Sequence, residues 1–273
     1  MRCQTSPRRQ DTDQGRRRQG TCSICLWNFP RIESKSQLNK MKIIFTPLFI
    51  VAIISCNTNQ QPAKRKNFTS AAPSVLAASA LNYDSCKKEI SLLKQKKKIV
   101  WDKLSKAEKE KLFTAATTQT IIPGWIGTAW DFNGTTETPQ KGTIACGYFV
   151  TTVLRDAGLP VARVKLAQCA SEQLITALIQ PKYIQRFSNT VIDVFIQSVQ
   201  QQGYGLYIVG LDNHVGFIYN DGKEIYFIHS TFVGTRNVQK EKAASSWVLS
   251  QSKYKVLGKL SADENVLAKW IRA

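Results

Sequence analysis

The chain has 273 residues, of which 43% are hydrophobic, and its formal net charge is +19. This is enough apolar material for one packed domain with extensions. The basic residues are scattered, with no aromatic-interleaved basic platform and no zinc-finger spacing, so we expect no nucleic-acid partner. The densest basic cluster is formed by Lys94, Lys96, Lys97 and Lys98, and we interpret it as the solvated face of a helix.

The first 40 residues differ from everything downstream. Arg8, Arg9 and Arg16 to Arg18 stand there among Gln, Thr and Asp with neither helical nor strand periodicity. Met41 then begins a pattern typical of a signal peptide, with Lys42 followed by the apolar run 43–54 and by Ser55-Cys56. Such a run is shorter than the ~20 residues that span a bilayer, and it fits the apolar region of a signal peptide. We therefore expect residues 1–40 to be a non-native upstream extension.

The end of the apolar run, Ile53-Ile54-Ser55-Cys56, resembles the bacterial lipobox. In signals of that family the cysteine thiol receives a diacylglyceryl group and becomes the new N-terminus. The resemblance implies that residues 41–55 are a lipoprotein signal peptide and that Cys56 is lipidated. Asn57 stands where an Asp would resemble an inner-membrane retention signal, so an outer membrane facing the periplasm is favoured.

The tether and the first helices follow. Residues 56–82 are rich in Asn, Gln, Ser, Ala and Pro and indicate a flexible tether, which leaves residues 83–273 as the folded domain. Residues 85–100 predict a basic amphipathic helix. Ser105 and Glu108 have the spacing of a capping box and predict the start of a second helix. Pro123-Gly124 is expected to break that helix and to open an irregular stretch over residues 125–142.

The second half of the domain changes its periodicity. Residues 144–157 predict a helix that Gly158-Leu159-Pro160 ends, as a helix C-terminus requires. After Gly203 the period changes to two, as in strands. The remaining expected elements are helices over 171–179, 189–201 and 262–271 and strands over 204–210, 214–219, 224–228 and 253–257. Helices followed by an antiparallel meander predict an α+β domain.

Cys146 is the first candidate for chemistry, because it stands at the start of a predicted helix. Unpaired N–H groups and the partial positive charge at a helix N-terminus favour a thiolate. A free thiol is only a few per cent ionised at neutral pH, so a nucleophile needs such activation. By itself the position says little, since a cysteine in an apolar helix is more often a small buried hydrophobe.

The chain has only two histidines, His214 and His229, on neighbouring predicted strands. The Asp221-Gly222 dipeptide between them is a strong signal for a two-residue hairpin turn. With that turn His214 falls directly opposite His229 on the same face, with Cβ atoms ~5 Å apart. One imidazole could then take the thiol proton while the other holds it in the right tautomer.

Two other interpretations of these residues stay open. The histidines could be a structural pair across the hairpin, or they could bind zinc if Asp212 or Cys146 supplied a third ligand. We rank the metal site second and expect neither a metal nor another cofactor. Cys22 and Cys25 form a C-x-x-C without a second ligand pair, which we treat as chance. The sequence does not decide whether Cys86 and Cys169 pair.

These motifs together resemble the NlpC-type, papain-like cell-wall cysteine peptidases. Residues 143–150, TIACGYFV, and 156–159, DAGL, are similar to the nucleophile helix of that family. Residues 213–219, NHVGFIY, are similar to the strand of its base, and residues 227–230, FIHS, to the strand of its third catalytic residue. The resemblance covers about residues 126–231 and follows the order Cys, His, His.

The chain also departs from the pattern of the family. Ala145 and Gly147 stand where members commonly have Asp and Ser, and the upstream Tyr-x-Trp-Gly-Gly element is present only as residues 130–134, WDFNG. The resemblance implies a papain-like fold in which a nucleophile helix packs on an antiparallel sheet. It also implies substrate contacts by Trp130, Asp131 and Tyr148; Trp125 is a further candidate for the groove.

The resemblance implies an envelope hydrolase that cleaves amide bonds in peptidoglycan stem peptides. Cys146 would attack the carbonyl, His214 would take and return the proton, and His229 would orient His214. The Cys146 N–H and a donor from residues 130–134 would hold the oxyanion. Two alternatives remain: a non-catalytic envelope-binding lipoprotein on the same scaffold, and an amidase or acyltransferase that acts on another acyl bond.

Overall fold

The structure is a computed structural model that describes residues 83–273. The expected extension, signal peptide, Cys56 and tether lie outside the described residues. Within residues 83–273, no helix combines the length and the hydropathy that crossing a membrane requires.

A six-stranded sheet forms the centre of the described part, with the strand order β1-β6-β2-β3-β4-β5 and every neighbouring pair antiparallel. Strands β2, β3 and β4 form the expected meander, β5 extends it, and β6 lies between β1 and β2. The prediction of an α+β domain is confirmed. The strands are β1 Ile184–Ser188, β2 Gly205–Leu211, β3 Val215–Asn220, β4 Ile225–Ser230, β5 Val238–Lys242 and β6 Tyr254–Gly258.

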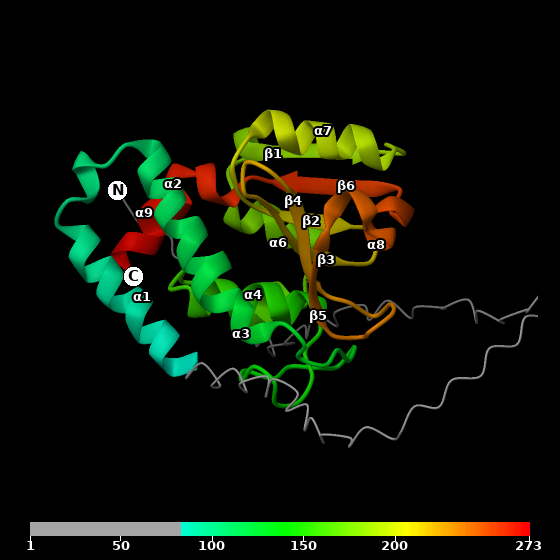
Figure 1. Ribbon diagram of the computed structural model, residues 1–273, viewed down its shortest axis with the longest axis horizontal. Helices are drawn as coiled ribbons and strands as arrows, with labels where there is room; N and C mark the ends of the chain where they lie inside the picture. The colour runs from blue at the N-terminus through cyan, green and yellow to red at the C-terminus, as the bar shows by residue number, and fades with distance from the viewer. Residues whose placement is uncertain (1–82) are drawn as a thin grey trace, which may run out of the picture. The chain divides into compact units, whose positions relative to one another are not determined.

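Helices lie on both faces of the sheet and at one end of it (Figure 1). Helices α1, α2 and α9 gather at the end away from β4 and β5. The helices are α1 Tyr83–Lys98, α2 Lys106–Ala115, α3 Ile122–Trp125, α4 Cys146–Asp156, α5 Arg163–Ala167, α6 Ser171–Leu178, α7 Ile192–Gln202, α8 Trp247–Gln251 and α9 Glu264–Arg272. Shorter turns are η1 Trp101–Lys103, η2 Ala116–Ile121, η3 Pro181–Tyr183, η4 Ala243–Ser245 and η5 Leu260–Ala262.

The two faces of the sheet carry separate cores. On one face α4 packs against β3, where the rings of Phe149 and Phe217 meet edge to face at 5.9 Å. On the other face Phe195 of α7 packs in a second cluster with Phe227 of β4. Because strand side chains alternate between faces, this division decides which face each candidate site residue occupies.

Local signals in the sequence set several element boundaries as expected. The Ser105 hydroxyl accepts the Glu108 N–H while the Glu108 carboxylate accepts the Ser105 N–H, so the capping box is present. Gly158 follows α4 with a φ of +88°, a conformation that costs glycine little. Its N–H and that of Leu159 cap the last turn of the helix.

The helical segment does not break at Pro123-Gly124 but ends one residue later, at Trp125, and the expected irregular stretch follows it. After α2 the chain passes through the π-helical turn η2 and continues into α3, and Pro123 lies in the first turn of α3. Proline is tolerated there because its missing N–H would have no helical partner. Elements α5, β1, β5 and α8 were not predicted. The edge strands β1 and β5 are polar, so they lack the apolar alternation that marks a strand.

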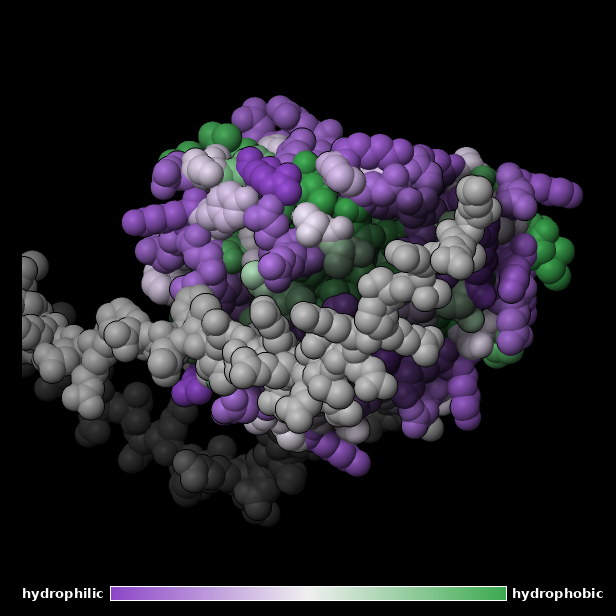
Figure 2. Space-filling model, turned by 180° about the vertical axis from the view of Figure 1, so that it is seen from behind, coloured by the Kyte–Doolittle hydropathy of each residue, from purple (hydrophilic) through white to green (hydrophobic). Residues whose placement is uncertain are grey.

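Hydrophilic side chains cover most of the face opposite to that of Figure 1, and apolar residues gather near its centre (Figure 2). The termini of the described part, Tyr83 and Ala273, both belong to the helical end.

Candidate active site

Cys146 is the first residue of α4, and its side chain is half-buried. The carbonyl of His214 accepts the N–H of Leu211 on β2. The next N–H along the strand, that of Val215, therefore points away from β2 and toward β4. The β3–β4 ladder ends at the pair Phe217–Ile228, so the Val215 N–H makes no hydrogen bond to β4. It instead faces the Cys146 thiol as a hydrogen-bond donor. The thiol thus lies beside the plane of the sheet, next to the residue that follows His214.

The expected lowering of the thiol pKa is not found. Burial raises the pKa of the Cys146 thiol above its usual range, although the N–H groups of Val215, Gly147 and Cys146 itself act in the opposite direction. The net effect is a raised pKa, so the resting side chain is a neutral thiol. A nucleophile at this position depends on a base to take its proton.

The predicted hairpin register is wrong by two residues. The turn between β3 and β4 holds four residues, 221–224, so Asn220 pairs with Ile225 and His229 falls opposite Gly216. The Asp221 carboxylate accepts the N–H groups of Lys223 and Glu224, which stabilises this longer turn. A shift by two residues keeps every side chain on its face, so His214 and His229 still meet, but diagonally.

The two imidazoles are joined by a short contact. His214 Nε2 lies 2.8 Å from His229 Nδ1, with the rings nearly perpendicular. Gly216 leaves the space for this diagonal contact, since a Cβ there would lie 2.9 Å from His229 Cβ and 2.7 Å from Phe227 Cε2. The Phe227 ring stacks on His229 at 3.9 Å and fixes the plane of that imidazole.

The outer nitrogen of His229 faces two residues of β5 that the sequence analysis did not single out. His229 Nε2 lies 3.2 Å from Glu241 Oε1 and 3.2 Å from the amide nitrogen of Gln239. Glu241 in turn accepts hydrogen bonds from the Ser246 hydroxyl at 2.5 Å and from the Gln239 amide at 3.4 Å. Glu241 lies two positions from Gln239, the observed cross-strand partner of His229. Because β5 was not predicted, the sequence offered no signal for either residue.

The Glu241 carboxylate decides the tautomer of both rings. A carboxylate only accepts, so in its pairing with Glu241 His229 Nε2 carries the proton and His229 Nδ1 is the acceptor. The Gln239 amide then donates to Glu241 and not to His229. His214 Nε2–H then donates to His229, which leaves His214 Nδ1 unprotonated. Glu241 thus supports the form of His214 that can take a proton.

Both imidazoles are neutral near pH 7. Burial, and next the neighbouring His229, hold the pKa of His214 well below its usual value. Burial also lowers the pKa of His229, and the hydrogen bond and charge of Glu241 oppose this shift. His214 is 5% exposed and His229 is fully buried, which is why desolvation is the largest cause for both.

His214 Nδ1 is buried and has no hydrogen-bond partner, so the thiol and the imidazole are not hydrogen-bonded. The two separate cores on the faces of the sheet explain why this hydrogen bond is absent. Helix α4 covers the face of Phe217, whereas His229 shares the opposite face with the stacked Phe227. His214 precedes β3 and its ring packs near Phe227 as well, with centroids 6.1 Å apart. The thiol and the imidazole therefore approach the end of the β3–β4 ladder from different faces.

The aromatic candidates divide between the site and the core. Trp130 is half-buried and packs on Phe232, whose ring lies 5.8 Å from that of His214. The guanidinium of Arg236 lies over the other side of Trp130 at 5.0 Å. Trp125 is fully buried and donates to the Tyr83 hydroxyl, so it belongs to the core and cannot line a groove.

Tyr148 and Asp131 have local partners. The Tyr148 ring lies under Arg163, and its hydroxyl accepts a hydrogen bond from the Gln168 amide. Asp131 accepts the N–H of Asn133 through its carboxylate and that of Gly134 through its carbonyl. The Trp130 N–H donates to the carbonyl of Arg236. The N–H groups of Trp130, Asn133 and Gly134 are thus all occupied in hydrogen bonds and do not supply the expected oxyanion donor.

Packing against α5 explains why position 147 carries a glycine. A Cβ at this position would lie 2.3 Å from the carbonyl oxygen of Ala167, the last residue of α5. Real Cβ atoms do not approach backbone so closely, so a serine at 147 requires α5 to move. The departure from the family pattern after the cysteine thus goes with the presence of this unpredicted helix.

The alternatives concerning metals and disulfides can be placed on the structure. Within residues 83–273 no group of three or more His, Cys, Asp or Glu side chains is arranged to hold a metal. Asp212 is turned toward the start of β6, where its carboxylate accepts the N–H groups of Lys253 and Tyr254. Cys86 and Cys169 are free thiols and do not pair.

Comparison of the chain with models of protein families, with curated proteins and with solved structures gives no match.

Proposed function

We propose that the described domain is a thiol hydrolase with Cys146 as nucleophile, His214 as base and His229 as its orienting partner. The observation that carries this proposal is the His214–His229–Glu241 chain. In this arrangement the unprotonated Nδ1 of His214 is buried and has no hydrogen-bond partner. His214 directly precedes Val215, whose N–H faces the Cys146 thiol. A purely structural histidine pair has no need of an unsatisfied ring nitrogen, which costs free energy when buried.

In the proposed reaction His214 Nδ1 takes the Cys146 proton as sulfur bonds to the carbonyl carbon of an amide. The C–N bond then breaks while the imidazolium returns the proton to the leaving amine. Water, deprotonated by the same His214, hydrolyses the thioester and regenerates the thiol. Because both groups are neutral at rest, the proton transfer accompanies the attack instead of preceding it.

The surroundings of the two groups support these steps. Glu241 lies at the far end of the relay and stabilises the positive charge that develops on the imidazoles. The Cys146 N–H at the first position of α4 is an oxyanion donor. No hydrogen bond joins the thiol to His214 Nδ1 here, so the proposed proton transfer requires the two groups to approach each other when substrate binds. Such tightening on substrate binding is common among catalytic hydrogen bonds.

We further propose a papain-like fold, an anchored location in the bacterial envelope and a substrate among peptidoglycan stem peptides. The fold and the substrate class rest on the resemblance of residues 126–231 to NlpC-type peptidases. The location rests on the lipobox-like residues 53–56. Phe232 packs on both His214 and Trp130, and the half-buried Trp130 is our first candidate for contact with substrate.

A non-catalytic envelope-binding lipoprotein is the second candidate. Two observations favour it: the thiol pKa is raised, and no hydrogen bond joins the thiol to His214. In that case the histidine–glutamate chain stabilises the β3–β5 region only, and the aromatic residues around His214 form a binding surface.

Incubation with purified peptidoglycan, followed by mass analysis of released fragments, separates the two candidates. The hydrolase proposal expects muropeptide fragments from the wild type and none from Cys146→Ala. Cys169→Ala is the matched control, because that thiol is also half-buried but lies outside the relay. Equal fragment release by Cys146→Ala would rule out Cys146 as the nucleophile. No fragments from any of the three proteins, while the wild type still sediments with peptidoglycan, would favour the non-catalytic candidate.

A further inference from the structure

The helical end of the domain carries several cations without an acidic partner. Lys96 and Lys98 end α1, Lys109 lies on α2, and Arg272 ends α9. Among residues 83–273, the ion pairs that involve α1, α2 or α9 engage Lys87, Lys106, Lys182 and Lys259 only. The four free cations therefore have no carboxylate of the described residues within ion-pair distance, which leaves a strongly positive surface.

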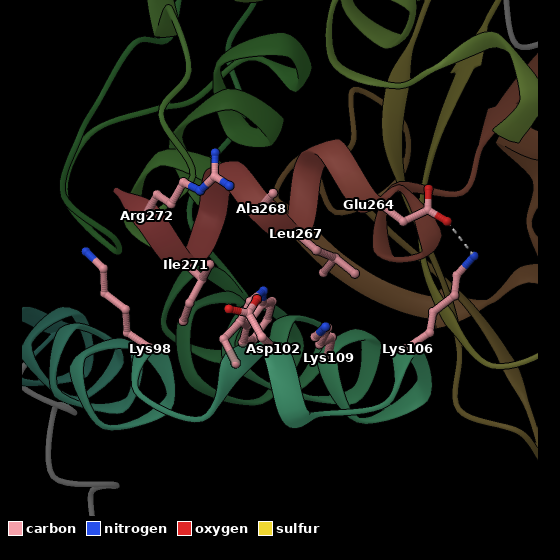
Figure 3. Close-up of a pocket in the computed structure, with 10 residues that line it drawn as sticks. Lys98, Asp102, Lys106, Lys109, Glu264, Leu267, Ala268, Ile271 and Arg272 are labelled. Carbon is pink, nitrogen blue, oxygen red and sulfur yellow. Dashed lines mark hydrogen bonds and ion pairs between the residues drawn. The ribbon is translucent and has the colours of Figure 1, made fainter.

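A groove of about 570 Å³ opens among these cations, between η1 and α2 on one side and α9 on the other. Figure 3 shows Lys98 and Lys106 reaching toward α9 from the two ends of the groove, with Arg272 projecting from its far wall. Trp101, Leu267, Ala268 and Ile271 supply its apolar lining, and the carboxylates of Asp102 and Glu264 also line it, against four cations. Only Lys106 is neutralised, by Glu264 at 3.1 Å, while the Lys109 ammonium lies over the Trp101 ring.

An apolar tip stands next to this groove. Ile99, directly after Lys98, is 86% exposed, and Val100 is 37% exposed. Leu92, seven residues before Ile99 and thus on the same face of the helical segment, is 55% exposed. A small hydrophobic group projects beyond hydrophilic neighbours at the edge formed by this end of the molecule (Figure 2). Lysines on both sides of exposed aliphatic residues are the pattern of interfacial membrane segments.

We propose that this end of the domain docks on an anionic phospholipid surface. Ile99 and Val100 would enter the headgroup region, and Lys98, Lys109 and Arg272 would hold lipid phosphates at the groove. Complementary charge selects this partner, because anionic lipids attract basic residues near the surface, while the exposed aliphatic tip gains from leaving water. An acidic protein would match the charge but would leave Ile99 without an apolar contact.

The docked orientation leaves the candidate active site free. The C-terminal end of α4 lies against α1, where Lys94 Nζ donates to the carbonyl of Gly158 at 2.9 Å. Cys146 is at the other end of this eleven-residue helix, ~16 Å away along its axis. Docking through α1 and α9 therefore points the thiol away from the bilayer. The inference depends only on the helical end and stands whether or not the domain is a hydrolase.

The test uses residues 56–273, the chain expected after removal of the signal peptide, with Cys56→Ser so that no acyl chain can attach, and vesicles of phosphatidylcholine with and without 30% phosphatidylglycerol. This parent should co-sediment with anionic vesicles far more than with neutral ones, and less as salt is raised. Lys96→Glu with Lys98→Glu should weaken anionic-vesicle binding by roughly tenfold or more. Ile99→Ser should weaken it several-fold at unchanged charge.

Matched controls lie elsewhere on the domain. Lys165→Glu with Lys253→Glu changes the net charge equally, and Val194→Ser removes an apolar side chain that is also half exposed or more. Both should bind anionic vesicles nearly as the parent does. The proposal is overturned if the parent binds both vesicles equally, or if the Lys96/Lys98 variant binds as the parent does. The parent could also bind soluble polyglutamate as strongly as it binds anionic vesicles. If Ile99→Ser does not change that binding, the surface is assigned to an acidic protein instead.

Discussion

His214 and His229 are in contact although they are not cross-strand partners. Their ring nitrogens lie 2.8 Å apart, while the residue opposite His229 on β3 is Gly216. The contact is diagonal, and it exists because the position between the two imidazoles carries no side chain. The relay that we propose for catalysis therefore depends on a glycine that takes no part in the chemistry.

Replacing Gly216 should break that arrangement. In Gly216→Ala the new Cβ would meet Phe227 and His229, so we expect overpacking to cost about 1–3 kcal/mol of unfolding free energy. Peptidoglycan hydrolysis should fall with it. Denaturant unfolding and fragment release are the measurements. The double variant Gly216→Ala/Phe227→Leu should recover part of the stability, because the nearest clashing atom belongs to the Phe227 ring. No loss in the single variant would contradict the assigned register.

The histidines should differ in importance. His214→Ala should lose nearly all turnover and should slow alkylation of Cys146 by iodoacetamide, because the base is gone. His229→Ala should be milder and His229→Gln milder still, since an amide oxygen can accept the His214 N–H and preserve its tautomer. Initial rates of fragment release give the ranking. If His229→Gln is as inactive as Cys146→Ala while His214→Ala keeps activity, the two roles are reversed.

Glu241 should act through the tautomer and the charge of the imidazoles. Glu241→Gln removes the carboxylate that fixes the His229 proton, so kcat should fall on the order of 10²-fold with little change in KM. Because Glu241 raises the pKa of His229, the acidic limb of the pH–rate profile should move to lower pH.

Glu224→Gln is the matched control for Glu241→Gln, because Glu224 pairs with Lys242 at the surface and lies outside the relay. It should leave both the rate and the profile unchanged. A merely structural role for Glu241 would lower the amount of folded protein without moving the pH profile.

Acid should destabilise the domain through the two histidines. Their pKa values are lowered in the folded state, so below the unfolded value of about 6.5 the unfolded chain binds protons that the folded chain excludes. The stabilisation is complete above that pH and is lost as the pH falls below it, by up to ~1.4 kcal/mol per pH unit for each histidine. Urea unfolding at pH 7.5 and 5.5 measures the slope. The variant His214→Gln/His229→Gln should show a flatter one, and an equal slope would refute the assignment.

Cys56 should carry a lipid when the chain is expressed from Met41 in a host that processes lipoproteins. The proposal rests on Lys42, the apolar run 43–54 and Ser55-Cys56. Mass spectrometry of the N-terminal peptide should show a diacylglyceryl-modified Cys56, and Cys56→Ser should abolish the modification and leave the precursor uncleaved. An intact chain with an unmodified Cys56 would exclude the lipoprotein hypothesis.

Local signals in the sequence predicted much of the fold. The capping box at Ser105, the terminator at Gly158 and the apolar stripe of residues 144–157 each depend on a few neighbouring residues, and α2 and α4 follow from them. The edge strand β5 carries alternating charged and polar residues and could be found only through its pairing with β4. Missing β5 meant missing Glu241.

Cys146, His214 and His229 were singled out from the sequence, whereas Glu241, Gln239 and the geometry of the site were not. Asp221-Gly222 indicated a two-residue turn, whereas the Asp221 carboxylate stabilises a longer one, and only the even shift kept the histidines on one face. The expected activation of Cys146 by the helix N-terminus is outweighed by burial, a property of the whole fold that no local pattern reports.

The contact between Gly147 and α5 also constrains how this domain can change over generations. Because the Ala167 carbonyl fills the space of a Cβ at position 147, a serine there is inaccessible by single substitution while α5 keeps its place. Displacement of α5 must come first, and once serine is established the helix cannot return. Relatives should therefore fall into two classes, in which the residue after the cysteine and the segment 163–167 covary, with no viable intermediate that combines serine with a close α5.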